Sequence, residues 1–132
     1  MFSDILLYAV LVVLVDYVYL SHVSVPFGKM MKKIQKSEMR VNKLAAAIVY
    51  VMLIVGWFVF IHEEMSRHSY YKNLWRSFLL GVVIYSVFDF TNLALIRDYR
   101  LDLAIIDSLW GGCLFAITTA LFLGIKKFVK RP

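Results

Sequence analysis

The chain has 132 residues, 61% of them hydrophobic, and its mean hydropathy is +0.73. A soluble domain is nearer to half apolar, so this composition excludes an ordinary soluble globular fold. A single cysteine, Cys113, excludes an intrachain disulfide. The formal net charge is +6, and in a membrane protein such a basic excess usually lies in loops that face anionic lipid headgroups.

The first apolar run covers residues 5–21. The residues before it carry Asp4 and no Lys or Arg, and no small-residue cleavage site follows, so a spanning helix is favoured over a secretory signal. Three further runs, at residues 44–61, 74–96 and 103–125, are also long enough to cross a bilayer. The sequence therefore predicts an all-α, integral membrane four-helix bundle that forms one domain over residues 1–132.

The loop between the first two runs is basic. After Pro26, which can open a helix, apolar residues from Phe27 to Ile34 recur at helical spacing among lysines. This pattern predicts a short interfacial amphipathic helix in the first loop, with a solvated loop as the alternative. Its cations favour docking to anionic lipid headgroups or an acidic protein partner, and less strongly to nucleic acid. They are Lys29, Lys32, Lys33, Lys36, Arg40 and Lys43.

Three aspartates interrupt three different apolar runs. At a rise of 1.5 Å per residue, Asp16 lies about 7 Å inside the end of its run that is nearest the first loop. Asp89 and Asp107 lie about 12 and 7 Å inside the ends of their runs that are nearest the third loop. In a four-span bundle those loops share one side of the membrane, so the three carboxyls fall in one leaflet. An isolated ionised Asp near mid-helix costs at least about 2.5 kcal/mol, so we expect these carboxyls to be hydrogen-bonded, protonated or hydrated.

Other polar side chains lie at similar depth or beside the aspartates. Tyr85, Asp89 and Asn92 follow one another at i, i+4 and i+7, which places them on one face of the third helix. The predicted intramembrane polar cluster consists of Asp16, Tyr50, Tyr85, Asp89, Thr91, Asn92, Asp107 and Trp110.

A hydrogen-bonded structural cluster that fixes helix pairing is the favoured interpretation of these residues. The second interpretation is a hydrated, proton-coupled transport site. The third is a cation site with oxygen ligands, and the fourth is a catalytic site. The sequence has no spaced nucleophile–base pair, phosphate-binding loop or His/Cys metal motif. No catalytic residue, metal ligand or cofactor is therefore predicted.

A family resemblance rests on paired motifs in the third and fourth runs. The motif residues are Tyr85, Asp89, Thr91, Asn92, Leu93 and Ala94, followed by Asp107, Trp110 and Gly111. They resemble the Asp-x-Thr-Asn-Leu signature of an uncharacterised family of small, four-span predicted membrane proteins. Tyr99-Arg100 departs from that family's aromatic-proline turn. The resemblance implies an integral membrane protein with no assigned activity, in either a cell membrane or a virion membrane.

Two functional classes follow from these observations. The favoured one is a non-enzymatic structural or interaction protein of a membrane, held together by the aspartates and docked through its basic loop. The alternative is a small proton- or cation-coupled transporter or channel that uses the intramembrane aspartates. Four spans leave little room for a transport path, so this alternative calls for a homo-oligomer or a larger membrane assembly. The loops of the two sides carry nearly equal numbers of Lys and Arg, so orientation stays open.

Overall fold

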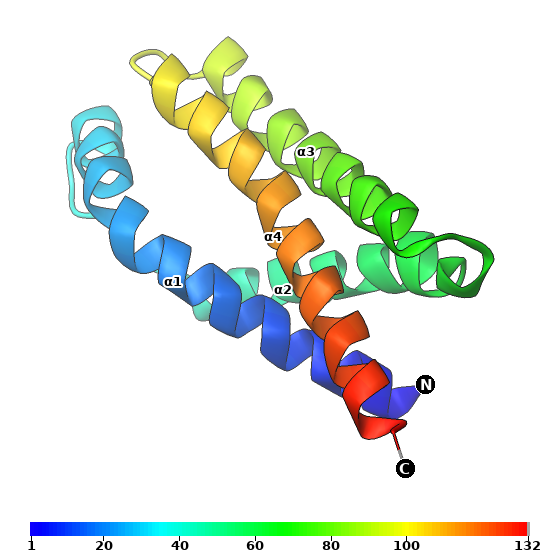
Figure 1. Ribbon diagram of the computed structural model, residues 1–132. Coiled ribbons are helices and arrows are strands. Elements are labelled where there is room, and N and C mark those ends of the chain that lie inside the picture. Colours follow the sequence, from blue (N-terminus) through cyan, green and yellow to red (C-terminus); the bar gives the residue numbers. More distant parts are fainter. Residues whose placement is uncertain (132) are drawn as a thin grey trace.

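The computed structural model describes residues 1–131 and is almost entirely helical (Figure 1). Its elements are α1 (Phe2–Gln35), α2 (Lys43–Trp57), a π-helical turn η1 (Phe58–His62), a 3-10 turn η2 (Met65–Arg67), α3 (Tyr70–Leu95) and α4 (Leu101–Val129). Four helical stretches are long and apolar enough to cross a membrane: Phe2–Gln35, Lys43–Arg67, Tyr70–Leu95 and Leu101–Val129. The predicted all-α fold with four candidate spans is confirmed.

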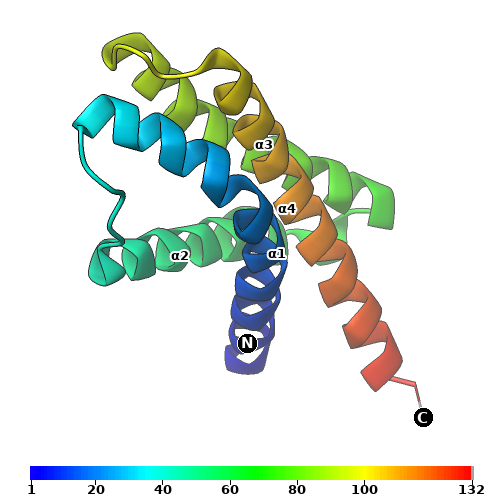
Figure 2. The same cartoon turned by 90° about the vertical axis from the view of Figure 1, so that its left-hand side faces the viewer.

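The first helix extends beyond its predicted end. The amphipathic segment is helical, but it continues α1 through Pro26 to Gln35 and does not start a separate helix. Proline removes one backbone donor from a helix interior, and Figure 2 shows α1 bending partway along its length. Upstream of the proline, Ser21 Oγ and His22 Nδ1 each lie 2.7 Å from the Val18 carbonyl oxygen. The predicted boundary at residue 21 was therefore too early.

Side chains and a left-handed residue define the helix ends. α1 stops at Lys36, whose φ of 60° turns the chain while its N–H bonds to the Lys32 carbonyl. Asn42 caps α2 by accepting from the Ala45 N–H at 3.0 Å, and Ser69 caps α3 by accepting from the Lys72 N–H at 3.3 Å. Short polar residues are favoured at such N-caps because they satisfy backbone donors that have no partner within the helix.

The α3–α4 hairpin is the most extensive helix pair (Figure 1). Its helices meet at a glycine seam, which consists of Gly81, Gly111 and Gly112. A Cβ added at Gly81 would overlap the backbone of Gly111, and one at Gly112 would overlap Phe78 and Val82. Small residues at a crossing let two membrane helices approach closely and gain van der Waals contact.

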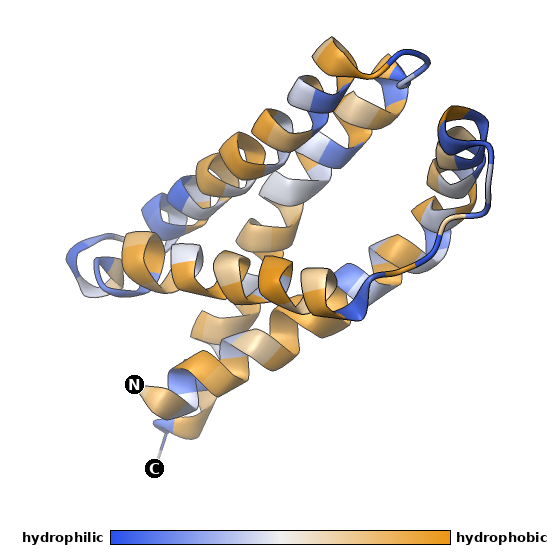
Figure 3. Ribbon diagram, turned by 180° about the vertical axis from the view of Figure 1, so that it is seen from behind, coloured by the Kyte–Doolittle hydropathy of each residue, from blue (hydrophilic) through white to orange (hydrophobic). Residues whose placement is uncertain are grey.

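Helices α1 and α2 complete the fold in different ways. α1 packs on α4, while α2 contacts mainly α1 and diverges from α3 beyond the turn that joins them (Figures 1 and 3). The larger core cluster includes Tyr8, Trp57 and Phe115, which are fully buried. The rings of Tyr8 and Trp57 stack with a centroid separation of 3.7 Å. Figure 3 shows that the longest hydrophilic stretches lie at helix ends and loops.

A smaller core cluster joins the end of α1 to the α3–α4 turn. Met30, Tyr99, Leu103 and Ala104 are buried together there. The Arg100 N–H lies 3.2 Å from Met30 Sδ. The first and third loops therefore lie at the same end of the molecule.

Candidate functional site: an acid layer and a hydroxyl layer

Asp16 lies where three helices meet. Its side chain is buried in α1, and each carboxylate oxygen has a donor from another helix. Tyr50 of α2 donates its hydroxyl to Oδ2 at 2.5 Å, and Trp110 of α4 donates Nε1–H to Oδ1 at 3.0 Å. One side chain thus joins α1, α2 and α4.

Asp107 joins α4 to α1 a second time. Its Oδ1 accepts from the Tyr19 hydroxyl at 2.9 Å. The Tyr19 ring also stacks on Trp110, with centroids 4.5 Å apart and planes 11° from parallel. Because Asp16 and Tyr19 are three residues apart, both reach α4 from the same face of α1.

Asp89 is fully buried on α3 and only half satisfied. Its Oδ1 accepts from the Tyr99 hydroxyl at 2.9 Å, and its carboxyl lies next to that of Asp107. Oδ2 has no hydrogen-bond partner among the described residues. Tyr99 was not predicted as a site residue, because it lies in a turn outside the apolar run. The only feature of the sequence that could have indicated Tyr99 is its position close to the end of α3.

The acid layer is defined here as the three carboxyls and their four donors: Asp16, Asp89, Asp107, Tyr19, Tyr50, Tyr99 and Trp110. The remaining predicted cluster residues lie at different distances from it. Tyr85 is half-buried and close enough to Asp16 and Asp107 to interact electrostatically, and the Asn92 side chain lies beside the Tyr99 hydroxyl.

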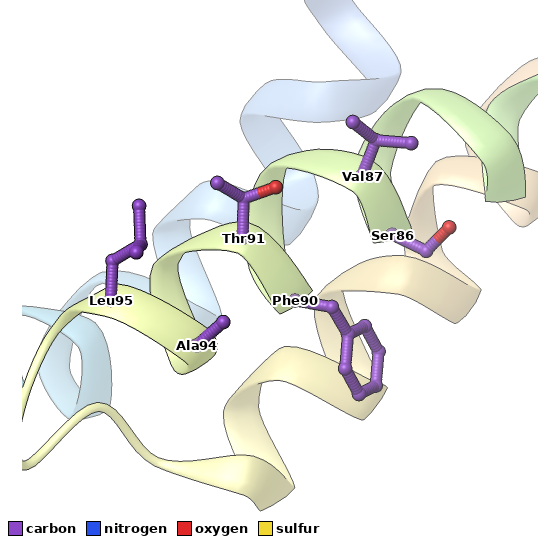
Figure 4. Close-up of a pocket in the computed structure, with 6 residues that line it drawn as sticks. All are labelled: Ser86, Val87, Phe90, Thr91, Ala94 and Leu95. Atoms are coloured by element: carbon purple, nitrogen blue, oxygen red, sulfur yellow. The ribbon is translucent and has the colours of Figure 1, made fainter.

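Thr91 lies outside the acid layer. It is exposed on the outer face of α3, beside Val87 and Leu95 (Figure 4). Thr91 follows Asp89 by two residues, and residues at this spacing lie on different faces of a helix. Its position in the family signature therefore does not put it in contact with the aspartates.

Acceptors outnumber donors in the acid layer. Four hydrogen bonds serve three carboxyl groups, and no Lys or Arg side chain contacts them in residues 1–131. Arg76, the cation within the third apolar run, donates to the Phe60 carbonyl at 2.8 Å instead. In the described part of the chain, no three acidic, His or Cys side chains lie close enough to hold a metal ion. The carboxyls therefore depend on neutral donors and on each other.

A second polar group, the hydroxyl layer, lies farther along the same helices. It consists of Tyr8, Trp57, Ser77, Thr118 and Thr119. Trp57 Nε1–H donates to Thr119 Oγ1 at 2.9 Å, Thr119 donates to Ser77 Oγ at 2.8 Å, and Ser77 donates to the Asn73 carbonyl at 2.8 Å. The Thr118 hydroxyl lies 3.0 Å from that of Tyr8 and 2.7 Å from the Leu114 carbonyl. Sequence reasoning missed this layer because Ser and Thr are ordinary within apolar helices.

The predicted basic surface lies at the end formed by the first and third loops. All six of its cations are exposed, as are Arg97 and Arg100 of the third loop. Lys32 pairs with Glu38 and Lys33 with Asp98. Within residues 1–131, four of the six have no salt-bridge partner: Lys29, Lys36, Arg40 and Lys43.

The chain matches a known protein family. Residues 1–123 match the model of the family described as "Predicted membrane protein (DUF2177)", whose function is unknown. No curated protein matches the chain, and no solved structure does.

Proposed function

The chain belongs to the family of predicted membrane proteins that it matches over residues 1–123, and from that premise we propose a non-enzymatic interaction protein of a membrane. In this proposal, the acid and hydroxyl layers hold the four helices in register. The basic end docks onto anionic lipid headgroups. Multi-pass insertion and headgroup docking together would fix the protein at an anionic membrane surface.

The observation that carries this proposal is the concentration of unpaired cations at one end. Lys29, Lys36, Arg40 and Lys43 are exposed and lack salt-bridge partners among the described residues. Each Lys or Arg near an anionic membrane surface contributes about 1 kcal/mol of attraction. Unlike the paired Lys32 and Lys33, these four lose no ion pair when they turn toward headgroups.

Spin-labelled lipids provide the test. Wild-type protein is reconstituted in phosphatidylcholine nanodiscs with spin-labelled phosphatidylglycerol or phosphatidylcholine as the reporter. We expect a preference for phosphatidylglycerol that falls as salt rises, because salt screens exposed charges. Replacing the four unpaired cations by Gln should reduce this preference about tenfold or more.

A matched variant removes the same charge from the opposite end. It carries Gln at four exposed cations without salt-bridge partners in the described chain: Lys72, Lys127, Lys130 and Arg131. It should keep most of the wild-type preference. An equal loss in both variants, or no preference in the wild type, would refute docking through the basic end and leave an acidic protein as the partner to test.

Proton- or cation-coupled transport is the second candidate. The observation that favours it is the buried Asp89 Oδ2, which has no partner in residues 1–131, next to the Asp107 carboxyl. Such a carboxyl could bind and release a proton during a cycle. If Asp89 carries the proton, Asp89→Asn should abolish proton flux in proteoliposomes under a pH gradient. Flux that is equal in the wild type and the variant would remove the candidate.

A further inference from the structure

A groove between α2 and α3 leads from the bilayer side of the protein to the acid layer. Its volume is about 390 Å³, within the range of roughly 300–1,000 Å³ that is usual for ligand pockets. Ile48 and Met52 of α2 and Ile84 and Phe88 of α3 line its apolar walls. Side chains of both helices line this groove, and α2 diverges from α3 beyond the turn that joins them (Figure 3).

The polar groups of this groove are a carboxyl and a phenol. Asp107 and Tyr85 line it, and every other lining side chain is apolar. Asp107 uses Oδ1 to accept from Tyr19, and no described residue donates to its Oδ2 or bonds the Tyr85 hydroxyl. Next to Asp107, Asp89 keeps Oδ2 buried and without a partner. The groove therefore combines apolar walls with one carboxyl, that of Asp107, and a second carboxyl lies buried next to it.

We propose that the groove binds an amphiphile with an apolar chain and a primary ammonium group. The ammonium would lie against the Asp107 carboxyl, which has the buried Asp89 carboxyl beside it, and the chain would lie between α2 and α3. This occupant is inferred from charge complementarity, since two adjacent carboxyls have no Lys or Arg partner in the described structure. Hydrogen bonds between an ammonium and a carboxylate are about twice as strong as neutral ones.

Other amphiphiles fit this site less well. A quaternary ammonium carries the charge but no N–H to give to the Asp107 carboxyl. An alcohol carries a donor but no charge. A phosphatidylethanolamine headgroup brings a phosphate that the carboxyls would repel. The inference goes beyond docking at the basic end and does not depend on it.

Binding of tritiated dodecylamine to purified protein in nonionic micelles tests the proposal, with protein-free micelles as the blank. We expect saturable binding that unlabelled dodecylamine displaces about tenfold more effectively than dodecyltrimethylammonium or dodecanol. Asp107→Asn and Asp89→Asn should each weaken binding by about tenfold or more. Helix content and elution volume establish that these variants stay folded.

A second pair of variants separates the groove from general folding. Met52 is 61% exposed in the groove, so Met52→Trp should fill the space without touching the carboxyls and should abolish binding. Val87 is 63% exposed on the outer face of α3, so Val87→Trp should leave binding unchanged (Figure 4). Equal displacement by the quaternary ammonium, unsaturable uptake, or full binding by Met52→Trp would overturn the proposal.

Discussion

The acid layer and the hydroxyl layer lie within the same helices but satisfy their hydrogen bonds differently. In the hydroxyl layer, donors follow one another from Trp57 through Thr119 and Ser77 to a backbone carbonyl. In the acid layer, Asp16 has two donors, while Asp89 leaves one buried oxygen without any among the described residues. Buried polar groups normally find partners, so the contrast separates a closed structural network from one with capacity left for a ligand or a proton.

The two layers are separated along every helix. Asp16 follows Tyr8 by eight residues on α1, and Asp89 follows Ser77 by twelve on α3, which corresponds to about 12 and 18 Å of helix rise. The glycine seam of Gly81 and Gly111 lies between them on α3 and α4. Changes at the seam should therefore disturb both layers, whereas changes within a layer should stay local.

The largest effect is expected at the seam. Gly81→Ala places a methyl group against the Gly111 backbone, which cannot move without separating α3 from α4. Overpacking of this kind typically costs about 1–3 kcal/mol, and we expect the upper end for a backbone clash. Unfolding followed by circular dichroism in a mixed-micelle denaturant series measures the loss.

Gly124→Ala is the matched control for this prediction. Apart from its chain neighbours and its own helix backbone, no atom lies within 4 Å of the Cβ that it would add. Alanine is the better helix former, so the stability of this variant should be equal to or slightly above that of the wild type. Equal losses at positions 81 and 124 would contradict the close contact at the seam.

An intermediate effect is expected in the acid layer. Asp16→Ala leaves the Tyr50 hydroxyl and the Trp110 N–H without their acceptor, at a cost of about 2 kcal/mol in the free energy of unfolding. Asp16→Asn keeps one carbonyl acceptor and should lose about half as much. The same unfolding series compares the two variants, and identical losses would mean that one carbonyl acceptor cannot replace the carboxylate.

The smallest effect is expected in the hydroxyl layer. Thr119→Val removes one hydroxyl between Trp57 and Ser77 and should cost about 1 kcal/mol, because Ser77 still donates to the Asn73 carbonyl. Thr91→Val, on the exposed face of α3, should change the free energy of unfolding by less than about 0.5 kcal/mol.

The double variant Asp16→Asn, Thr119→Val sharpens the comparison between the layers. Distant, independent sites add within about 0.5 kcal/mol, so additive losses are expected in the same unfolding series. A clear departure from additivity would show that the two layers act as one network.

Much of the fold could be predicted because hydropathy and length define membrane helices directly. The continuation of α1 past Pro26 could not, since proline more often starts a helix than lies within one. The divergence of α2 from α3 could not be predicted either. Because α2 is apolar on nearly all sides, its sequence has no hydrophobic stripe that indicates which helix it packs against.

The candidate site could be predicted only in part. Comparing helix depths leads to Asp16, Asp89 and Asp107, because depth depends only on position along a helix. Contacts across helices depend on rotation and on turns as well. Helical periodicity places Thr91 on a different face from Asp89. The hydrogen bond from Tyr99 to Asp89 depends on how the α3–α4 turn folds back over α3.

The contacts of Asp16 and Asp107 also have a consequence for the order of assembly. The α3–α4 hairpin joins neighbours in sequence, but Trp110 meets Asp16 across 94 residues and Tyr19 meets Asp107 across 88. Local pairs form before distant ones, so the hairpin should assemble first and α1 should dock later. Until α1 docks, Asp16 lacks the Trp110 donor of α4, and an ionised Asp near mid-helix costs at least about 2.5 kcal/mol. Asp16 and Asp107 therefore favour the completed assembly over separated helices.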